Sequence, residues 1–328
     1  MFTTIRTLVA AVATVSCLAT GVGGALAQNY PTRPIRLVIG LAPGGATDVL
    51  GRLVSTPLSA ELGQSIIVEN RPGAGAMLAG EVVVKAAPDG YTLLFGDISL
   101  AINPGLRKTL LFDVRKELAP IGLVAAAPLI LVVNASFPAR DLQELMALAK
   151  QSPGKFTYGS GGTGNTTHLI PELFKGKYGL DILHIPYKGS GLALTDLVAD
   201  RVSLAVIGLS VAKSFIESGK VRVLAITGEK RAAALPNVPT FAEAGAPLPE
   251  ANLGSWWGLL GPAGLPRNIV VQLNHALVRA LAQPELRARL AALNIAPVSS
   301  TPEEFASRMD SEISTWGGVV KRANIAPE

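Results

Sequence analysis

Three glycine-rich turns hold the residues of this sequence that could do chemistry. The first follows an apolar run at 37–41, and a helical pattern of apolar residues begins directly after its Pro-Gly-Gly text. A strand, a tight turn and a helix in this order expose backbone N–H groups at the positive end of the helix. Such a site can hold an anion without a cationic side chain. Thr47 is the expected N-cap, and Asp48 has two open roles, a contact to ligand or water and ordinary complementation of the helix dipole.

The second and third turns repeat this arrangement. Residues 158–168 end a strand, pass through several glycines and start a helix with hydroxyl side chains. They spell most of a phosphate-binding loop, but Asn165 stands where that loop needs its lysine, which disfavours a nucleotide hydrolase. The third turn, at 187–191, again separates a strand from a helix, and Tyr187 is expected to line the site. Three such turns at the carboxyl ends of strands indicate an anion-binding cleft between domains.

Enzyme chemistry is disfavoured by the side chains available. The three histidines lie far apart in the sequence and lack the spacing of metal ligands. Ser160 and Ser190 have no glycine two residues before them, so neither fits a nucleophile elbow. Serine–lysine pairs at 152–155 and 210–213 have no companion motif. We therefore expect no catalytic residue, no metal and no cofactor.

Composition indicates a globular, two-domain protein. Of the 328 residues, 16% are charged and 49% are hydrophobic, which excludes a disordered chain. The length suggests two domains. The formal net charge is only +5, and lysines and arginines are scattered without interleaved aromatic residues. Nucleic acid is therefore not an expected partner.

The first residues read as a secretory signal. Arg6 precedes an apolar stretch at 8–18, and Ala25-Leu26-Ala27 is a small-residue cleavage pattern. We expect cleavage after Ala27, so that 1–27 is removed. Cys17, the single cysteine, lies in this segment, and its lipidation is the alternative. The mature chain then has no disulfide and no thiol catalysis, and no later apolar run is long enough to span a bilayer.

The elements that must position the turns alternate along the chain. Short apolar, β-branched runs recur from residue 35 to residue 226, and most are followed by a helical pattern. This alternation is typical of an α/β architecture with parallel sheets. Three helices are expected after residue 265, and the last opens with a capping box at 301–304. The apolar stripe of this last helix is expected to pack in the core; it consists of Phe305, Met309, Ile313, Trp316 and Val320.

A series of motifs runs in order through the whole mature chain. They are Tyr30-Pro31-x-Arg33-Pro34-Ile35, Pro43-Gly44-Gly45-x-x-Asp48, Glu69-Asn70-Arg71-Pro72-Gly73-Ala74-Gly75, Pro88-Asp89-Gly90-Tyr91-Thr92, Asn103-Pro104, His168-Leu169, Glu172-Leu173-Phe174, Pro186-Tyr187-Lys188-Gly189-Ser190-Gly191, Val238-Pro239-Thr240-Phe241, Trp257-Gly258-Leu259 and Thr301-Pro302-Glu303-Glu304-Phe305. On these motifs the chain resembles the substrate-binding receptors of tripartite tricarboxylate transporters, the Bug/TctC type.

The resemblance implies a two-lobe α/β fold of the periplasmic binding protein type (type II, Venus flytrap), with mostly parallel sheets and a cleft between the lobes. One lobe would hold 28–127 plus 252–328 and the other 128–251. Trp256 and Trp257, near the second crossing between lobes, are expected to pack between them.

The resemblance also implies that two loops grip a small carboxylate through backbone N–H groups and ordered water. The ligand-binding residues expected on this basis, with residues of the third turn and of the strand end at 207–210, are Pro43, Gly44, Gly45, Ala46, Thr47, Asp48, Ser160, Gly161, Thr163, Gly164, Asn165, Thr166, Thr167, Tyr187 and Ser210.

The implied biology is capture of the carboxylate in the periplasm by a monomer that hands it to membrane permease subunits. The alternatives are a sensory or orphan receptor that signals without transport and, less favoured, a hydrolase. The sequence departs from the family pattern at Asn165, at Pro171 and at 207–210, where Ile-Gly-Leu-Ser replaces a more polar text. The last departure suggests a ligand whose far end is partly apolar or neutral.

Overall fold

The computed structural model describes residues 30–44, 46–252 and 254–325. The chain divides into two units, Met1–Thr32 and Arg33–Glu328, and the helices and strands named below lie in the second. The predicted signal segment, with Cys17 and Ala27, lies outside the described residues, and so does Gly45. In the part of the chain that is described, no helix combines the length and the apolar character needed to cross a membrane.

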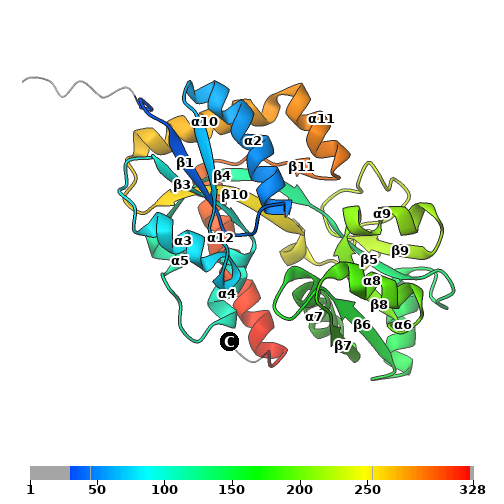
Figure 1. Cartoon of the computed structure of the whole chain (residues 1–328). Helices are drawn as coiled ribbons and strands as arrows, with labels where there is room; N and C mark the ends of the chain where they lie inside the picture. Colours follow the sequence, from blue (N-terminus) through cyan, green and yellow to red (C-terminus); the bar gives the residue numbers. More distant parts are fainter. Residues whose placement is uncertain (1–29, 45, 253, 326–328) are drawn as a thin grey trace, which may run out of the picture. The chain divides into compact units, whose positions relative to one another are not determined.

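The first sheet has six strands in the order β11-β4-β10-β3-β1-β2. Figure 1 shows α2, α10 and α11 on one side of this sheet and α3, α4 and α12 on the other. The strands are β1 (Ile35–Ile39), β2 (Ile66–Asn70), β3 (Thr92–Asp97), β4 (Leu118–Ala127), β10 (Ser255–Pro262) and β11 (Ala296–Pro297). The helices are α2 (Ala46–Leu62), η1 (Ala74–Ala76), α3 (Met77–Val84), α4 (Ser99–Leu106), α5 (Val114–Glu117), α10 (Arg267–Ala282), α11 (Pro284–Ala292) and α12 (Pro302–Arg322).

The second sheet has five strands in the order β7-β6-β8-β5-β9. Alternate residues of β5 pack into two different hydrophobic clusters, Leu131 and Val133 with α6 and α7, and Ile130 and Val132 with α8 and α9. Successive side chains of a strand point to opposite faces, so the sheet is covered on both sides. The elements are β5 (Leu129–Asn134), α6 (Leu142–Gln151), β6 (Phe156–Ser160), α7 (Thr166–Tyr178), β7 (Ile182–Pro186), α8 (Ser190–Val198), β8 (Leu204–Gly208), α9 (Leu209–Glu217), β9 (Val221–Ile226) and η2 (Pro249–Ala251).

Both sheets are mixed, and most strands of each run in the same direction, as the resemblance implied. Strand β10 runs antiparallel to β3 and β4, and β5 runs antiparallel to β8 and β9. The chain leaves the first sheet along β4 and returns along β10, and two neighbouring strands that carry it in opposite directions must be antiparallel. The first sheet takes its strands from 35–127 and 255–297 and the second from 129–226. The exact lobe bounds, 28–127 plus 252–328 and 128–251, stay a prediction.

The last helix has the start that its sequence predicts. Thr301 and Glu304 form a reciprocal capping box before α12, and the five residues of the predicted stripe are buried. The helix also supports β10, because the buried carboxylate of Glu312 accepts a hydrogen bond from Trp256 Nε1 at 2.6 Å.

A stack of rings supports the loop between β6 and α7. The His168 and His184 rings stack with centroids 3.9 Å apart, and Tyr158 stacks on His184 at 4.8 Å. Gly164 N–H donates to His168 Nδ1 at 3.0 Å, and Ser160 Oγ lies 2.7 Å from His184 Nε2. His168 can accept the Gly164 hydrogen bond only when Nδ1 carries no proton. The neutral histidine therefore fixes the loop.

We predict that acid weakens the fold through these histidines. Burial lowers the pKa of His184. The pKa of His168 is lowered from 6.5 to about 4, chiefly by burial and also by the His184 and Lys175 charges, while the Glu172 charge opposes the shift. Between these two values the unfolded chain binds a proton that the native His168 does not, so stability falls as pH falls. The expected loss attributable to His168 is on the order of 2 kcal/mol.

Urea unfolding at neutral and at mildly acidic pH measures this loss. In His168→Gln the free energy of unfolding should depend less on pH than in the wild type. The control His275→Gln, at an exposed position of α10, should keep the pH dependence of the wild type. An unchanged slope in His168→Gln would contradict the assignment.

A second prediction concerns the support of β10. Glu312→Leu leaves the Trp256 N–H buried without its acceptor, which should lower the free energy of unfolding by about 1–3 kcal/mol. Glu312→Gln keeps an acceptor oxygen and should cost less. Equilibrium unfolding of the two variants in urea makes the comparison, and equal stability of the leucine variant and the wild type would refute the role of this contact.

Candidate functional site

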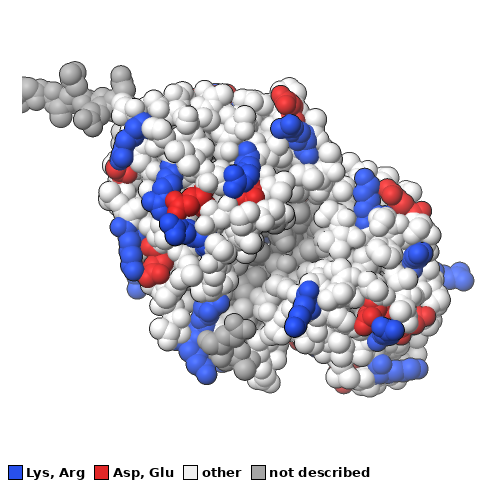
Figure 2. All heavy atoms as spheres, in the orientation of Figure 1, with Lys and Arg blue, Asp and Glu red and all other residues white. Residues whose placement is uncertain are grey.

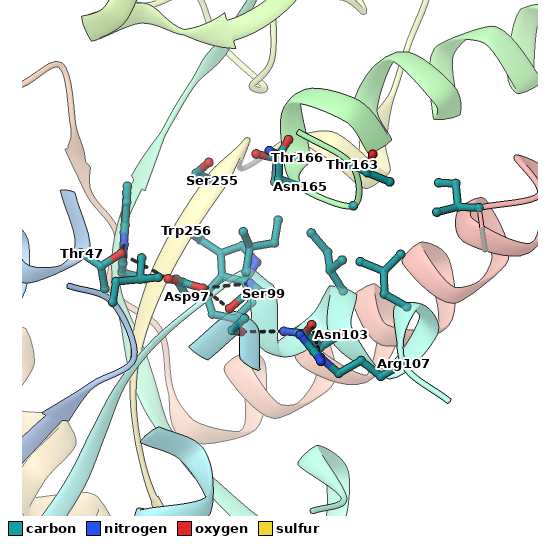
Figure 3. Close-up of a pocket in the computed structure, with 18 residues that line it drawn as sticks. Thr47, Asp97, Ser99, Asn103, Arg107, Thr163, Asn165, Thr166, Ser255 and Trp256 are labelled. Carbon is teal, nitrogen blue, oxygen red and sulfur yellow. Dashed lines mark hydrogen bonds between the residues drawn. The ribbon is translucent and has the colours of Figure 1, made fainter. Parts of the chain in front are cut away.

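A cavity of about 490 Å³ lies among elements of both sheets. In the space-filling view the region is a hollow whose surface is mostly uncharged (Figure 2). The residues that line the cavity are Leu41, Thr47, Gly75, Asp97, Ile98, Ser99, Ile102, Asn103, Leu106, Arg107, Thr163, Gly164, Asn165, Thr166, Ser255, Trp256, Trp257 and Ile325. Figure 3 shows Thr163, Asn165 and Thr166 on one side and Thr47, Asp97, Asn103 and Arg107 on the other.

The second sheet contributes the N-terminus of α7. The Asn165 side chain is the N-cap and accepts hydrogen bonds from the N–H groups of Thr167 and His168. Among the described residues, the N–H groups of Thr163 and Thr166 have no hydrogen-bond partner. Two unpaired donors and the positive end of a helix of 13 residues therefore lie at the cavity.

Gly164 brings this loop against the first lobe. Its φ of +78° lies in the left-handed region, and an added Cβ would come within 2.5 Å of Leu106 Cδ1. Leu106 is the last residue of α4, which follows β3 of the first sheet. The loop after β6 and the end of α4 are thus packed together at this cavity.

The predicted second turn lies only partly at the cavity. Thr163, Gly164, Asn165 and Thr166 line it. The other three form the base of the loop, because Gly161 N–H donates to Thr167 Oγ1 at 2.8 Å and Ser160 is fully buried against His184. Their hydrogen-bonding groups are used inside the loop.

Of the described residues of the predicted first turn, Thr47 alone lines the cavity. Helix α2 begins at Ala46, so the expectation that Thr47 is the N-cap is wrong. The Thr47 hydroxyl instead accepts from Trp257 Nε1 at 2.9 Å and donates to Asp97 Oδ2 at 3.2 Å. Pro43 and Ala46 are exposed and are not among the lining residues.

Asp48 holds the first turn together. Its buried carboxylate accepts from Gly44 N, Arg52 Nε and Asn70 Nδ2, each at 2.9 Å. Burial alone would raise the pKa of Asp48, but these hydrogen bonds and the Arg52 charge outweigh it and lower the pKa. Asp48 and Gly44 are therefore bonded to each other rather than directed into the cavity.

Two further predicted residues lie apart from the lining. Tyr187 donates its hydroxyl proton to Asp196 Oδ2 at 2.8 Å. Ser210 is exposed in the first turn of α9. Neither is among the residues around the cavity in this structure.

Sequence reasoning missed the helix α4 and its two charged ends. Asp97 ends β3 just before the helix, and Arg107 is the C-cap residue after it. Arg107 Nε donates to Asn103 Oδ1 at 3.1 Å, and Asn103 Nδ2 donates to the Gly75 carbonyl at 2.7 Å. Asn103 and Gly75 belong to motifs noted in the sequence, and this was the available signal. Arg107 lines the cavity, so a cationic side chain lies beside the backbone N–H donors there.

The arrangement suits the binding of a small organic anion. Within the described ranges, the Arg107 guanidinium has no carboxylate within ion-pair distance, so four of its N–H donors are open. The walls between the polar groups are apolar, formed by Leu41, Ile98, Ile102, Leu106, Trp256 and Trp257. Trp256 and Trp257, expected to pack between the lobes, thus take part in the cavity wall. Among residues 30–44, 46–252 and 254–325, no group of three acidic, histidine or cysteine side chains could hold a metal ion.

Comparison with known proteins agrees with this geometry. Residues 50–325 match the family described as the tripartite tricarboxylate transporter family receptor. The protein BugT of Bordetella pertussis is 36% identical over 297 residues, which cover 90% of each chain. The structure of Rpa4515 of R. palustris with adipate has 35% identity and a TM-score of 0.72, and it covers 91% of this chain and 100% of that one.

A second solved structure has the same fold. MatC from Rhodopseudomonas palustris with bound malate is 32% identical, with a TM-score of 0.69, and covers 89% of this chain and 100% of that one. The predicted two-lobe α/β binding-protein fold is thus confirmed, and with a family match over most of its length the chain belongs to the tripartite tricarboxylate transporter family of receptors.

Proposed function

We propose that this protein is an extracytoplasmic receptor that captures a small carboxylate in the cavity between its two sheets and presents it to a tripartite tricarboxylate transporter. The observation that carries the proposal is that the Arg107 guanidinium, which has no carboxylate partner among the described residues, and the N-terminus of α7 lie at one cavity. Adipate and malate in the two neighbouring structures support a carboxylate ligand.

The magnitudes are sufficient for a receptor. A hydrogen bond to a charged group contributes roughly 1.5–3 kcal/mol, and a helix N-terminus contributes about 0.3–1 kcal/mol more. Three or four such contacts, after the cost of ordering the ligand, reach the −8 kcal/mol or so of a micromolar complex. The contacts come from both sheets, so a ligand binds the closed arrangement better and shifts the population towards it.

The proposal includes export and a partner. The protein would act in the periplasm as a monomer after cleavage behind Ala27, and permease subunits would recognise the closed, loaded form. The receptor role accounts for the site without a catalytic step, since the family is one of receptors.

A thermal-shift screen with monocarboxylates, dicarboxylates, tricarboxylates and aromatic acids, beside sugars and cations, tests the proposed ligand class. Ligand at a hundred times its dissociation constant should stabilise the fold by about 2.7 kcal/mol. The proposal would be rejected if sugars or cations stabilise the protein and no carboxylate raises its melting temperature.

The role of Arg107 gives a sharper prediction. Arg107→Gln should weaken the best carboxylate roughly 10- to 100-fold, because it removes a charge-assisted contact. The matched control is Lys108→Gln, which changes the neighbouring, exposed cation and should leave affinity unchanged. Titration calorimetry measures both, and equal affinities for the two variants would exclude Arg107 from the site.

A further inference from the structure

The cavity also contains a carboxylate. Asp97 lines it from the end of β3, on the same side as Arg107 (Figure 3). Oδ1 of Asp97 accepts from the backbone N–H and the hydroxyl of Ser99, and thereby caps the first turn of α4. Among the described residues, Oδ2 accepts from the Thr47 hydroxyl alone.

Asp97 keeps one acceptor position open. An ionised carboxylate accepts about four hydrogen bonds, and the contacts above use three. The Thr47 hydroxyl is fixed as a donor to Asp97, because its oxygen already accepts from the indole N–H of Trp257, which can only donate. In the described part of the chain, no lysine, arginine or histidine lies within ion-pair distance of Asp97.

The residues of α4 that hold the two opposite charges lie about one helical turn apart. Asp97 is bonded to Ser99 and Arg107 to Asn103, and these two residues are four apart in α4. Positions four apart share one face of a helix at a rise of about 6 Å. Asp97 and Arg107 therefore lie along one face of α4 without pairing with each other, and both border the cavity.

We propose that the natural ligand is zwitterionic, a short amino carboxylate whose carboxylate contacts Arg107 and whose ammonium group contacts Asp97. The inference rests on the proposed carboxylate-binding function and narrows it. A ligand with a second carboxylate would place that group against Asp97 and meet like-charge repulsion. An ammonium group at the same place fills the open acceptor of Oδ2 and pairs its charge.

Two isosteric series test the proposal by titration calorimetry on the mature chain. One comprises butyrate, γ-hydroxybutyrate, γ-aminobutyrate and glutarate; the other comprises hexanoate, ε-aminocaproate and pimelate. In whichever series binds, the amino acid should bind at least about tenfold more tightly than the dicarboxylate and the unsubstituted acid. The hydroxy acid should bind more weakly than γ-aminobutyrate, because its hydroxyl group is a hydrogen-bond donor without a positive charge.

The variant Asp97→Asn should remove the preference for the amino acid. The amide removes the negative charge and can donate to a second carboxylate, so the preference for the amino acid over the dicarboxylate should fall at least about tenfold. The control is Asp310→Asn, an exposed aspartate of α12 that does not line the cavity.

The outcomes separate the two proposals. If glutarate or pimelate binds the wild type as tightly as the amino acid of the same series, the zwitterionic ligand is overturned and the carboxylate receptor stays in place. Binding by no carboxylate, with or without an amino group, would overturn the proposed function itself. The comparison within the wild type decides the matter even if Asp97→Asn does not fold.

Discussion

The cavity depends on β10, the strand on which the chain returns to the first sheet. Its two neighbouring tryptophans point to opposite sides and each donates its indole N–H to a buried partner, Trp256 to Glu312 of α12 and Trp257 to Thr47 of α2. A buried indole N–H needs an acceptor, so the strand and both helices are fixed relative to one another. The Thr47 hydroxyl in turn donates a hydrogen bond to Asp97, which caps α4. One strand thereby positions the whole first-sheet side of the cavity.

The opposite side is built on a separate principle. The loop after β6 satisfies most of its polar groups internally, through Asn165, Thr167 and His168, and the donors left over belong to Thr163 and Thr166 at the cavity. A loop that is already ordered loses little conformational entropy when it binds a ligand. The two sides meet where Gly164 packs on Leu106. A ligand between them would therefore contact groups of both sheets at once, as a receptor with a closing cleft requires.

The sequence predicted the alternating α/β fold and the loop at 163–166, because these follow from local strand, turn and helix patterns. It predicted the family through the series of motifs that resembles it. It predicted the first turn less well. The carboxylate of Asp48 is claimed by Gly44, Arg52 and Asn70, and the last of these lies 22 residues away, beyond any local motif. Asp97 and Arg107 were missed for a similar reason. Neither belongs to a glycine turn, and only the packing of α4 across the end of β3 brings both to the cavity. The antiparallel strands could not be predicted either, since they arise from the crossing between lobes rather than from strand composition.

The central claim is that one small carboxylate is held between groups of the two sheets. A crystal structure of the mature protein with its tightest-binding carboxylate tests this most directly. The account predicts electron density in which the ligand carboxylate contacts the Arg107 guanidinium and the ligand body lies against residues 163–166. A ligand seated elsewhere, or one touching residues of a single sheet with Arg107 turned away, would contradict it.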